Sequence, residues 1–334
     1  IRQSGTYWYH SHSGLQEQSG HYGPLIIDPI RPDPFKYQRD YVVMLSDWTF
    51  ENPYSVLRKI KTMGSYYNFQ KQTVVDFMQS VGKNGAKATF ADRMRWGAMR
   101  MDPTDIADVT GATYHYLMNG MTGGENWTGL FRSGEKIRLR FINGSAMTYF
   151  DVRIPGLKMT VVAADGQNIK PVRIDEFRIG VAETFDVIVE PDGNKPYTIF
   201  AETMDRSGFA RGTLAPQMGM QAGIPARRTR PVRGMTATGM MPGGMAKEPS
   251  TGMKDMKGMK SMSSDGMAGM TKGMEMPTKP GGESFKHGPD KHLPGSAMVS
   301  MYATDQTASP GIGLGNDGRR VLTYKDLRSL VPYE

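Results

Sequence analysis

Apolar and polar residues alternate with a period of two across residues 115–215, as they do in β-strands. Ile137, Leu139 and Phe141, for example, alternate with two arginines, which predicts a strand with one buried face and one solvated face. Pairs of turn residues separate such runs: Asn143-Gly144, Asp165-Gly166 and Asp192-Gly193. Short strands at this spacing are typical of a β-sandwich or barrel, and we predict one all-β domain that ends near residue 215.

Two earlier parts of the chain have patterns of their own. Aromatic and apolar runs predict further strands at residues 5–12, 22–29 and 41–45. Four apolar residues instead follow the i, i+3, i+4, i+7 spacing of one helical face: Val74, Phe77, Met78 and Val81. We therefore predict a partly helical insertion near residues 52–100.

Residues 233–284 contain no Leu, Ile, Val, Phe, Trp or Tyr. A segment of Met, Ala, Gly, Pro and polar residues cannot bury enough apolar surface to offset the entropy of ordering its backbone. We therefore predict a disordered, methionine-rich linker, which with its flanks covers residues 221–295.

Composition excludes several classes of protein. The 334 residues include no Cys, which excludes a disulfide framework, a thiolate zinc site, a cysteine nucleophile, an iron–sulfur cluster and a complete blue-copper site. The sequence contains no run of about 18 apolar residues, so it predicts no membrane span. The net charge is +8, with one basic cluster over residues 227–233. Because no nucleic-acid-binding motif accompanies that cluster, we interpret it as a solvated linker and expect no nucleic-acid partner.

The motif His10-Ser11-His12 is a candidate metal site. Residues two apart on a strand point to the same face, about 6.5–7 Å apart along the backbone, so each imidazole can serve a different metal of a closely spaced pair. Imidazole suits Cu, Zn, Fe or Ni, and the spacing does not choose among them. The alternative is that two exposed histidines share a strand face by chance. We interpret His21 as a surface or metal-supporting residue and His115 as structural.

Methionines are concentrated in the predicted linker. Twelve fall within residues 235–276: Met235, Met240, Met241, Met245, Met253, Met256, Met259, Met262, Met267, Met270, Met274 and Met276. Thioethers are soft ligands that select Cu(I). The alternatives are gap filling in a core, which the lack of other large apolar side chains disfavours, and a flexible partner-binding surface. His287 and His292 flank this tract as candidate further ligands or as loop residues.

Five stretches of the chain resemble the multicopper oxidases, which are built from cupredoxin domains. Their second histidine motif is similar to residues 5–13 (GTYWYHSHS), with Gln16, and to residues 23–29 (GPLIIDP). The opening strand of their second domain is similar to residues 42–48 (VVMLSDW), and the core of that domain to residues 116–120 and 134–190. Together with the methionine tract, this indicates the periplasmic copper-resistance branch of the family.

The resemblance implies the fold and the ligands. The fold is all-β, with cupredoxin-like Greek-key sandwich domains. It divides the chain into the tail of a first cupredoxin domain (residues 1–35), a second cupredoxin domain (36–220), the linker (221–295) and the lead-in to a third domain (296–334). His10 would bind one copper of the coupled type 3 pair and His12 the other. The type 1 copper ligands and the remaining cluster ligands are expected outside this chain.

The function implied is therefore that of a longer protein. The intact oxidase would oxidise Cu(I), with phenols as further candidates, and reduce O₂ to water, while this chain alone is expected to be inactive. The predicted partners are copper ions and O₂, and the expected location is the periplasm, with the export signal outside this sequence. The alternative is a non-enzymatic periplasmic protein that sequesters copper through the methionine tract.

Overall fold

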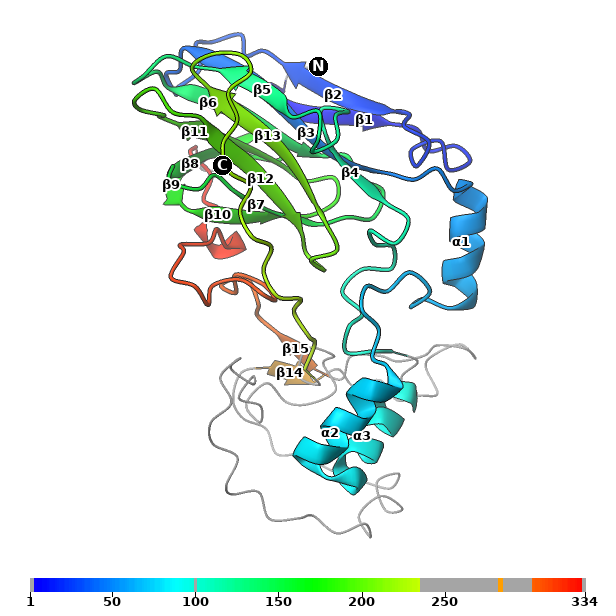
Figure 1. Ribbon diagram of the computed structural model, residues 1–334. Coiled ribbons are helices and arrows are strands. Elements are labelled where there is room, and N and C mark those ends of the chain that lie inside the picture. Colours follow the sequence, from blue (N-terminus) through cyan, green and yellow to red (C-terminus); the bar gives the residue numbers. More distant parts are fainter. Residues whose placement is uncertain (1–2, 99–100, 235–281, 285–301, 332–334) are drawn as a thin grey trace. The chain divides into compact units, whose positions relative to one another are not determined.

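Two β-sheets form the body of the computed structural model, which describes residues 3–98, 101–234, 282–284 and 302–331 (Figure 1). The six-stranded sheet has the order β4 (His115–Met118), β3 (Arg39–Trp48), β6 (Ile137–Asn143), β11 (Thr184–Val189), β8 (Met159–Ala164) and β9 (Gln167–Ile174). The five-stranded sheet has the order β10 (Glu176–Ile179), β7 (Phe150–Arg153), β12 (Tyr197–Thr203), β13 (Phe209–Ala215) and β5 (Trp127–Leu130). The chain passes repeatedly from one sheet to the other, which makes the body a sandwich.

The core lies between the two sheets. Leu139 and Phe141 of β6, Phe150 of β7 and Ile199 of β12 are all fully buried in one hydrophobic cluster. Neighbouring strands are antiparallel, except for the pairs β3 with β6 and β5 with β13. The prediction of an all-β sandwich is therefore confirmed.

The Asp165-Gly166 turn shows how local chemistry sets the register. Asp165 has φ 45° and Gly166 has φ 75°, so both central residues of the two-residue hairpin between β8 and β9 are left-handed. Asp-Gly is favoured there because Asp tolerates this conformation and Gly adopts it freely. Gly166 also packs on Tyr7, whose ring lies 2.4 Å from where a Cβ would be. A side chain at position 166 would adopt a strained backbone conformation and would force the ring of Tyr7 to shift.

The prediction of a solvated face on β6 is wrong. Arg138 is 2% exposed and Arg140 is 4% exposed, although their apolar neighbours do face the core as predicted. Arg138 donates to Asp186 on the adjacent strand β11, and Arg140 donates to Asp40 on β3 at 2.7–3.0 Å. The outer face of the six-stranded sheet is thus a layer of ion pairs.

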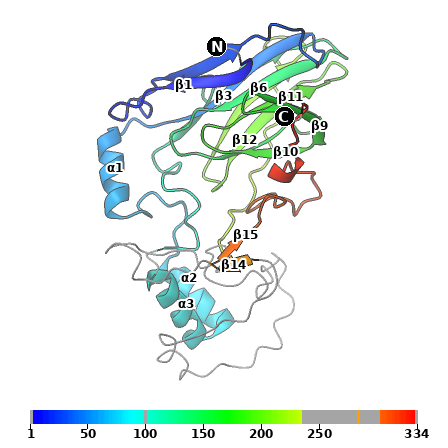
Figure 2. The same ribbon diagram turned by 180° about the vertical axis from the view of Figure 1, so that it is seen from behind.

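A hairpin of β1 (Gly5–His10) and β2 (Tyr22–Ile27) covers part of that outer face (Figure 2). Thr6 is buried there and accepts a hydrogen bond from Arg140, while its carbonyl accepts one from the Thr184 hydroxyl at 3.1 Å. The alternation in β6 predicts the strand correctly but does not reveal that a distant hairpin covers its polar side.

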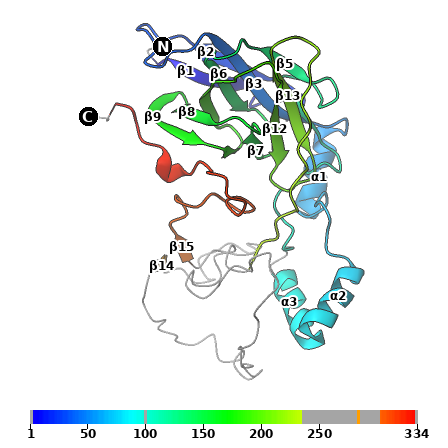
Figure 3. The same ribbon diagram turned by 60° about the vertical axis from the view of Figure 1, so that its left-hand side comes forward.

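The five-stranded sheet also has a covered polar face. Asp151 and Arg153 of β7 lie on this face and are 0% and 4% exposed. The segments that cover this face come from residues 226–231 and 307–330, and the second of these runs beside β9 and β10 (Figure 3). Leu322 of that segment joins the main core.

Three helices fill the predicted insertion and confirm it. They are α1 (Pro53–Thr62), α2 (Val74–Asn84) and α3 (Ala86–Ala98). Thr73 and Asp76 form a capping box that satisfies free amide groups at the start of α2. The four residues predicted to share an apolar face do lie on a helix, α2. That face is not buried, however, because Val74 is 78% and Met78 is 65% exposed.

Residues 233–306 form a separate unit, in which β14 (Gly282–Ser284) pairs with β15 (Tyr302–Thr304). The methionine tract, His287 and His292 lie outside the described residues. Within the described ranges, no helix has the length and apolar character needed to cross a membrane.

Candidate metal centre

The His-x-His motif lies at the end of the N-terminal hairpin. His10 is the last residue of β1 and lies opposite Tyr22 of β2, whereas His12 follows the end of the strand. The two imidazole rings nevertheless lie on the same side, with centroids 4.4 Å apart and planes at 35°. The structure thus brings together the two side chains that the sequence singled out.

The ring of His10 has defined neighbours. Trp8, two residues earlier on the same face of β1, stacks on it with a centroid distance of 4.4 Å and an interplanar angle of 14°. Nδ1 of His10 lies 3.2 Å from a carboxylate oxygen of Glu17 and 3.3 Å from the carbonyl oxygen of Ser11. The side chain of His10 is 26% exposed, and His12 is exposed. His10 is therefore oriented by protein contacts, while His12 is open to solvent.

The loop between the two strands, residues 11–21, is closed by its own hydrogen bonds. The amide of Ser11 donates to the carbonyl of His21 at 3.0 Å, and the Ser11 hydroxyl donates to the side chain of Gln16 at 2.7 Å. The amide of Gly20 donates to the carbonyl of Glu17 at 2.9 Å. These bonds hold the backbone that carries Glu17 next to His10.

The body of the sandwich also holds this loop. Tyr54 of α1 donates its hydroxyl hydrogen to the carbonyl of Gly14 at 2.9 Å. Tyr114 donates to the side chain of Gln18, and burial raises the pKa of Tyr114 above its ordinary value, so the hydroxyl keeps its hydrogen. Glu17 therefore lies between two anchored positions of the loop.

His10 and His12 present two neighbouring imidazoles, a type of donor that suits copper. Two rings that lie on the same side at the end of a strand can each face a different metal of a closely spaced pair. Within the part of the chain that the structure describes, no group of three or more His, Cys, Asp or Glu side chains is arranged to hold a metal. His10 and His12 thus fit copper as part of a ligand set and not as a whole one.

The two other described histidines differ in position. His21 is exposed at the base of the loop, where its carbonyl accepts the amide of Ser11 and its own amide donates to the carbonyl of Gln16, both at 3.0 Å. His115 begins β4 and contacts the ring edge of Phe50, with centroids 5.5 Å apart.

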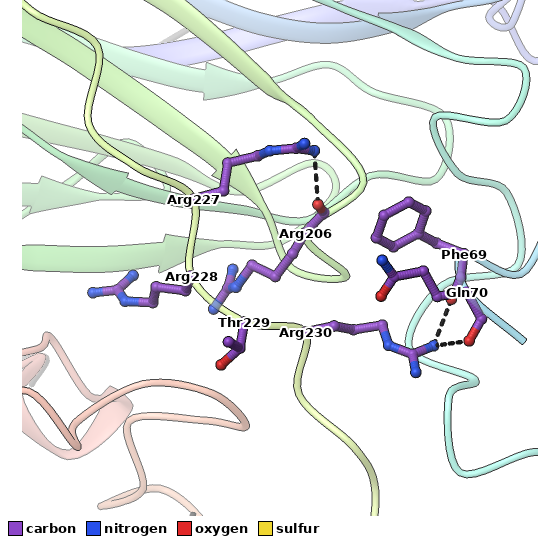
Figure 4. Close-up of a pocket in the computed structure, with 7 residues that line it drawn as sticks. All are labelled: Phe69, Gln70, Arg206, Arg227, Arg228, Thr229 and Arg230. Carbon is purple, nitrogen blue, oxygen red and sulfur yellow. Dashed lines mark hydrogen bonds between the residues drawn. The ribbon is translucent and has the colours of Figure 1, made fainter. Parts of the chain in front are cut away.

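The basic cluster near residue 228 lines an open pocket of about 610 Å³ (Figure 4). Arg230 donates to the carbonyls of Phe69 and Gln70, and burial lowers its pKa below the ordinary value. Arg227 donates to the carbonyl of Arg206 at 3.0 Å. The cluster does lie in a segment without helix or strand, as predicted for a linker, but these guanidinium groups hold neighbouring backbone and the cluster is only partly solvated.

Arg228 has the most strongly charged surroundings in the cluster. It donates to both carboxylate oxygens of Glu176, at 2.5 and 2.6 Å, and to Asp317 at 2.8 Å. Burial alone would lower the pKa of Arg228, but these carboxylates raise it above the ordinary value. Arg228 thereby ties the segment that follows β13 to β10, through Glu176, and to the segment after residue 307, through Asp317.

Two residues at the site were not predicted. Trp8 was within reach of sequence reasoning, because alternation along β1 places it on the same face as His10. Glu17 follows His10 by seven residues in a loop, and such a separation corresponds to no regular spacing. Only the fold of the loop brings its carboxylate to the imidazole.

Comparisons with known proteins identify a matching family and similar relatives. A family model described as multicopper oxidase matches residues 39–219, and a second model with the same description matches residues 1–32. "Copper resistance protein A" of Escherichia coli is 54% identical over 98% of this chain. "Copper resistance protein A homolog" of Pseudomonas syringae pv. tomato is 55% identical over 98% of the chain. This chain covers 57% and 56% of these two relatives, so it spans little more than half of their length.

Two solved structures are similar to about two thirds of this chain. The multicopper oxidase Fet3p, described as functioning in iron import, is 20% identical with a TM-score of 0.47, over 68% of this chain and 36% of that one. A laccase from Botrytis aclada is 24% identical with a TM-score of 0.46, over 69% of this chain and 38% of that one.

Proposed function

Because the chain belongs to the multicopper oxidase family, we propose that it is part of a periplasmic copper-resistance oxidase. In the intact protein, the substrate oxidised would be Cu(I), with phenols as further candidates, and O₂ would be reduced to water. The observation that carries this proposal is the pair His10 and His12, whose rings lie 4.4 Å apart inside the segment matched by a multicopper oxidase model. Identity above 50% to two copper resistance proteins supports the choice of copper as substrate.

His10 and His12 would each bind one copper of a coupled pair. Bound copper would supply reversible one-electron chemistry next to O₂. Four Cu(I) ions would each lose one electron, and one O₂ would take up four electrons and four protons to give two water molecules. The remaining ligands, including those of a type 1 copper, would come from the part of the protein beyond this chain.

The methionine tract would capture Cu(I) for this reaction. Thioethers bind Cu(I) without losing a proton, so this binding should depend little on pH, unlike binding by His or Cys. Twelve thioethers within residues 235–276 supply far more soft donors than one ion needs. The tract would therefore hold several Cu(I) ions near the oxidase.

Removing four regularly spaced thioethers should weaken Cu(I) binding by the intact protein. The variant changes these residues to Ser: Met253, Met256, Met259 and Met262. We expect a lower number of bound Cu(I) ions and weaker competition against a Cu(I) chelator, with the same loss at pH 5 and pH 7. Unchanged Cu(I) binding would contradict the role of the tract.

A matched control removes the same number of thioethers elsewhere. It changes exposed methionines outside the tract to Ser: Met63, Met78, Met94 and Met218. This control should bind Cu(I) as the unmodified protein does.

The test of the proposed function uses the intact, copper-loaded protein. Oxygen uptake on addition of Cu(I), at one O₂ for every four Cu(I), together with the blue absorption of a type 1 copper, would support an oxidase. Copper uptake without oxygen consumption would support the alternative, a protein that only sequesters copper.

A further inference from the structure

We propose that Glu17 is a positioning residue that fixes which ring nitrogen of His10 faces the metal. The inference rests on the proposed function, because it takes His10 as a copper ligand. It adds an acidic residue from the loop after the motif to the machinery of the site.

The side chains of Glu17 and His10 lie in contact. A carboxylate oxygen of Glu17 lies 3.2 Å from Nδ1 of His10. An imidazole that binds a metal through one nitrogen carries its hydrogen on the other, and a carboxylate beside that nitrogen stabilises this tautomer. Glu17 therefore favours hydrogen on Nδ1 and leaves Nε2 as the donor atom for copper.

Stacking on Trp8 does not determine which edge of the His10 ring carries Nδ1. Trp8 lies on the His10 ring at 4.4 Å and 14°, which restricts the plane of the imidazole. A rotation of the ring by half a turn about the Cβ–Cγ bond keeps that plane but exchanges the positions of nitrogen and carbon. Stacking is nearly the same in both orientations, so a polar neighbour must distinguish them. Glu17 and the Ser11 carbonyl, at 3.3 Å, are the polar groups placed at Nδ1.

Glu17 is itself held in place by the loop. Its carbonyl accepts the amide of Gly20 at 2.9 Å, and the loop on either side of it is anchored by Tyr54 and Tyr114. Among the described residues, the only basic side-chain nitrogen within salt-bridge distance of the Glu17 carboxylate is Nδ1 of His10. The side chain of Glu17 is 27% exposed, so water reaches it but does not separate the pair.

The test compares Glu17→Ala and Glu17→Gln in the intact, copper-loaded protein. Removing a partner that orients a ligating histidine typically costs 10–100-fold in metal affinity, and we expect Glu17→Ala to lose the copper pair at a 10–100-fold lower chelator concentration. Glu17→Gln keeps a neutral acceptor and should recover part of the loss. The readouts are the near-ultraviolet absorption of the coupled pair and the electron paramagnetic resonance signal that appears when the pair loses one copper.

Two further variants separate the role of Glu17 from that of His10. Glu190→Ala removes a carboxylate that is 59% exposed and pairs with Lys136, and this control should retain the copper pair. His10→Ala should lose the copper pair entirely. If His10→Ala keeps the pair, the proposed function of His10 fails; if His10→Ala loses it and Glu17→Ala keeps it, only the role of Glu17 fails.

A purely structural role of Glu17 would also overturn the inference. The metal-free form of Glu17→Ala should unfold at the same temperature as the unmodified metal-free protein. An equal loss of stability with and without copper would show that Glu17 supports the loop and not the ligand.

Discussion

Replacing Asp151 by Asn should lower the free energy of unfolding of the sandwich by about 3–5 kcal/mol, the usual cost of breaking a buried ion pair on one side. Asp151 is fully buried in β7 and accepts hydrogen bonds from two arginines. Arg178 donates to it at 2.7 and 3.0 Å, and Arg206 donates at 2.6 Å. Asn has nearly the same shape but no charge, so Arg206, which is 2% exposed, would keep only the carboxylate of Glu202, at 3.9 Å, as a counter-ion.

Amide hydrogen exchange in the intact, metal-free protein can measure this loss. Exchange of peptides from β7 and β12 reports the opening free energy of this sandwich alone, even when other domains are present. The exposed Asp28→Asn serves as the matched control and should change that free energy by less than about 0.5 kcal/mol. Equal protection in Asp151→Asn and the unmodified protein would contradict the prediction.

The stability lost in Asp151→Asn should become smaller at low pH. Burial raises the pKa of Asp151, but Arg178 and Arg206 lower it more, so its pKa in the folded protein lies below the ordinary 3.8. A lowered carboxyl pKa contributes stability that is fully present above the unfolded value and is lost as pH falls through the folded value. The difference between Asp151→Asn and the unmodified protein should therefore be constant above about pH 5 and shrink below about pH 3.

Period-two alternation was enough to predict the strands but not what covers them. Around Leu139 and Phe141 it placed β6 and its core face correctly, because side-chain direction follows from strand geometry alone. It failed for Arg138 and Arg140, because the groups that neutralise and cover them come from distant parts of the chain. A charged residue is normally exposed unless it is paired, and pairing depends on the tertiary fold.

The candidate site shows the same division. The spacing of His10 and His12 was sufficient to expect both rings on one side, and the structure brings them together. The contribution of Glu17 could not be read from spacing, since it depends on the closure of the loop over residues 11–21. Sequence pattern thus identifies donors on regular elements, whereas the groups that orient them are found only in the fold.

Asp47 is a second buried carboxylate, with a different environment from that of Asp151. It is 2% exposed at the end of β3 and accepts hydrogen bonds from the amides of Ala146, Met147 and Thr148 at 3.0–3.1 Å. The Thr148 hydroxyl donates a fourth at 2.7 Å. Asp47 thus holds the turn after β6 in place.

Because four donors depend on it, Asp47→Ala should cost about 3 kcal/mol or more, since each buried donor left without an acceptor costs about 1–3 kcal/mol. Asp47→Asn should cost only about 1 kcal/mol, because the amide oxygen retains the bonds to Met147 and Thr148, while the amide nitrogen faces the donor of Ala146. Exchange of the amides over residues 144–150 measures both losses.

The pH dependence of Asp47 should be opposite to that of Asp151. Burial raises the pKa of Asp47, and its hydrogen bonds lower the pKa by less, so the folded value lies above the ordinary 3.8. A raised carboxyl pKa contributes stability that is present below the unfolded value and is lost as pH rises through the folded value. Relative to Asp47→Asn, the unmodified protein should therefore become more stable as the solution is acidified from pH 7 toward pH 4. If both Asp→Asn variants lost the same stability with the same pH dependence, the contrast between an ion-paired and an unpaired buried carboxylate would be wrong.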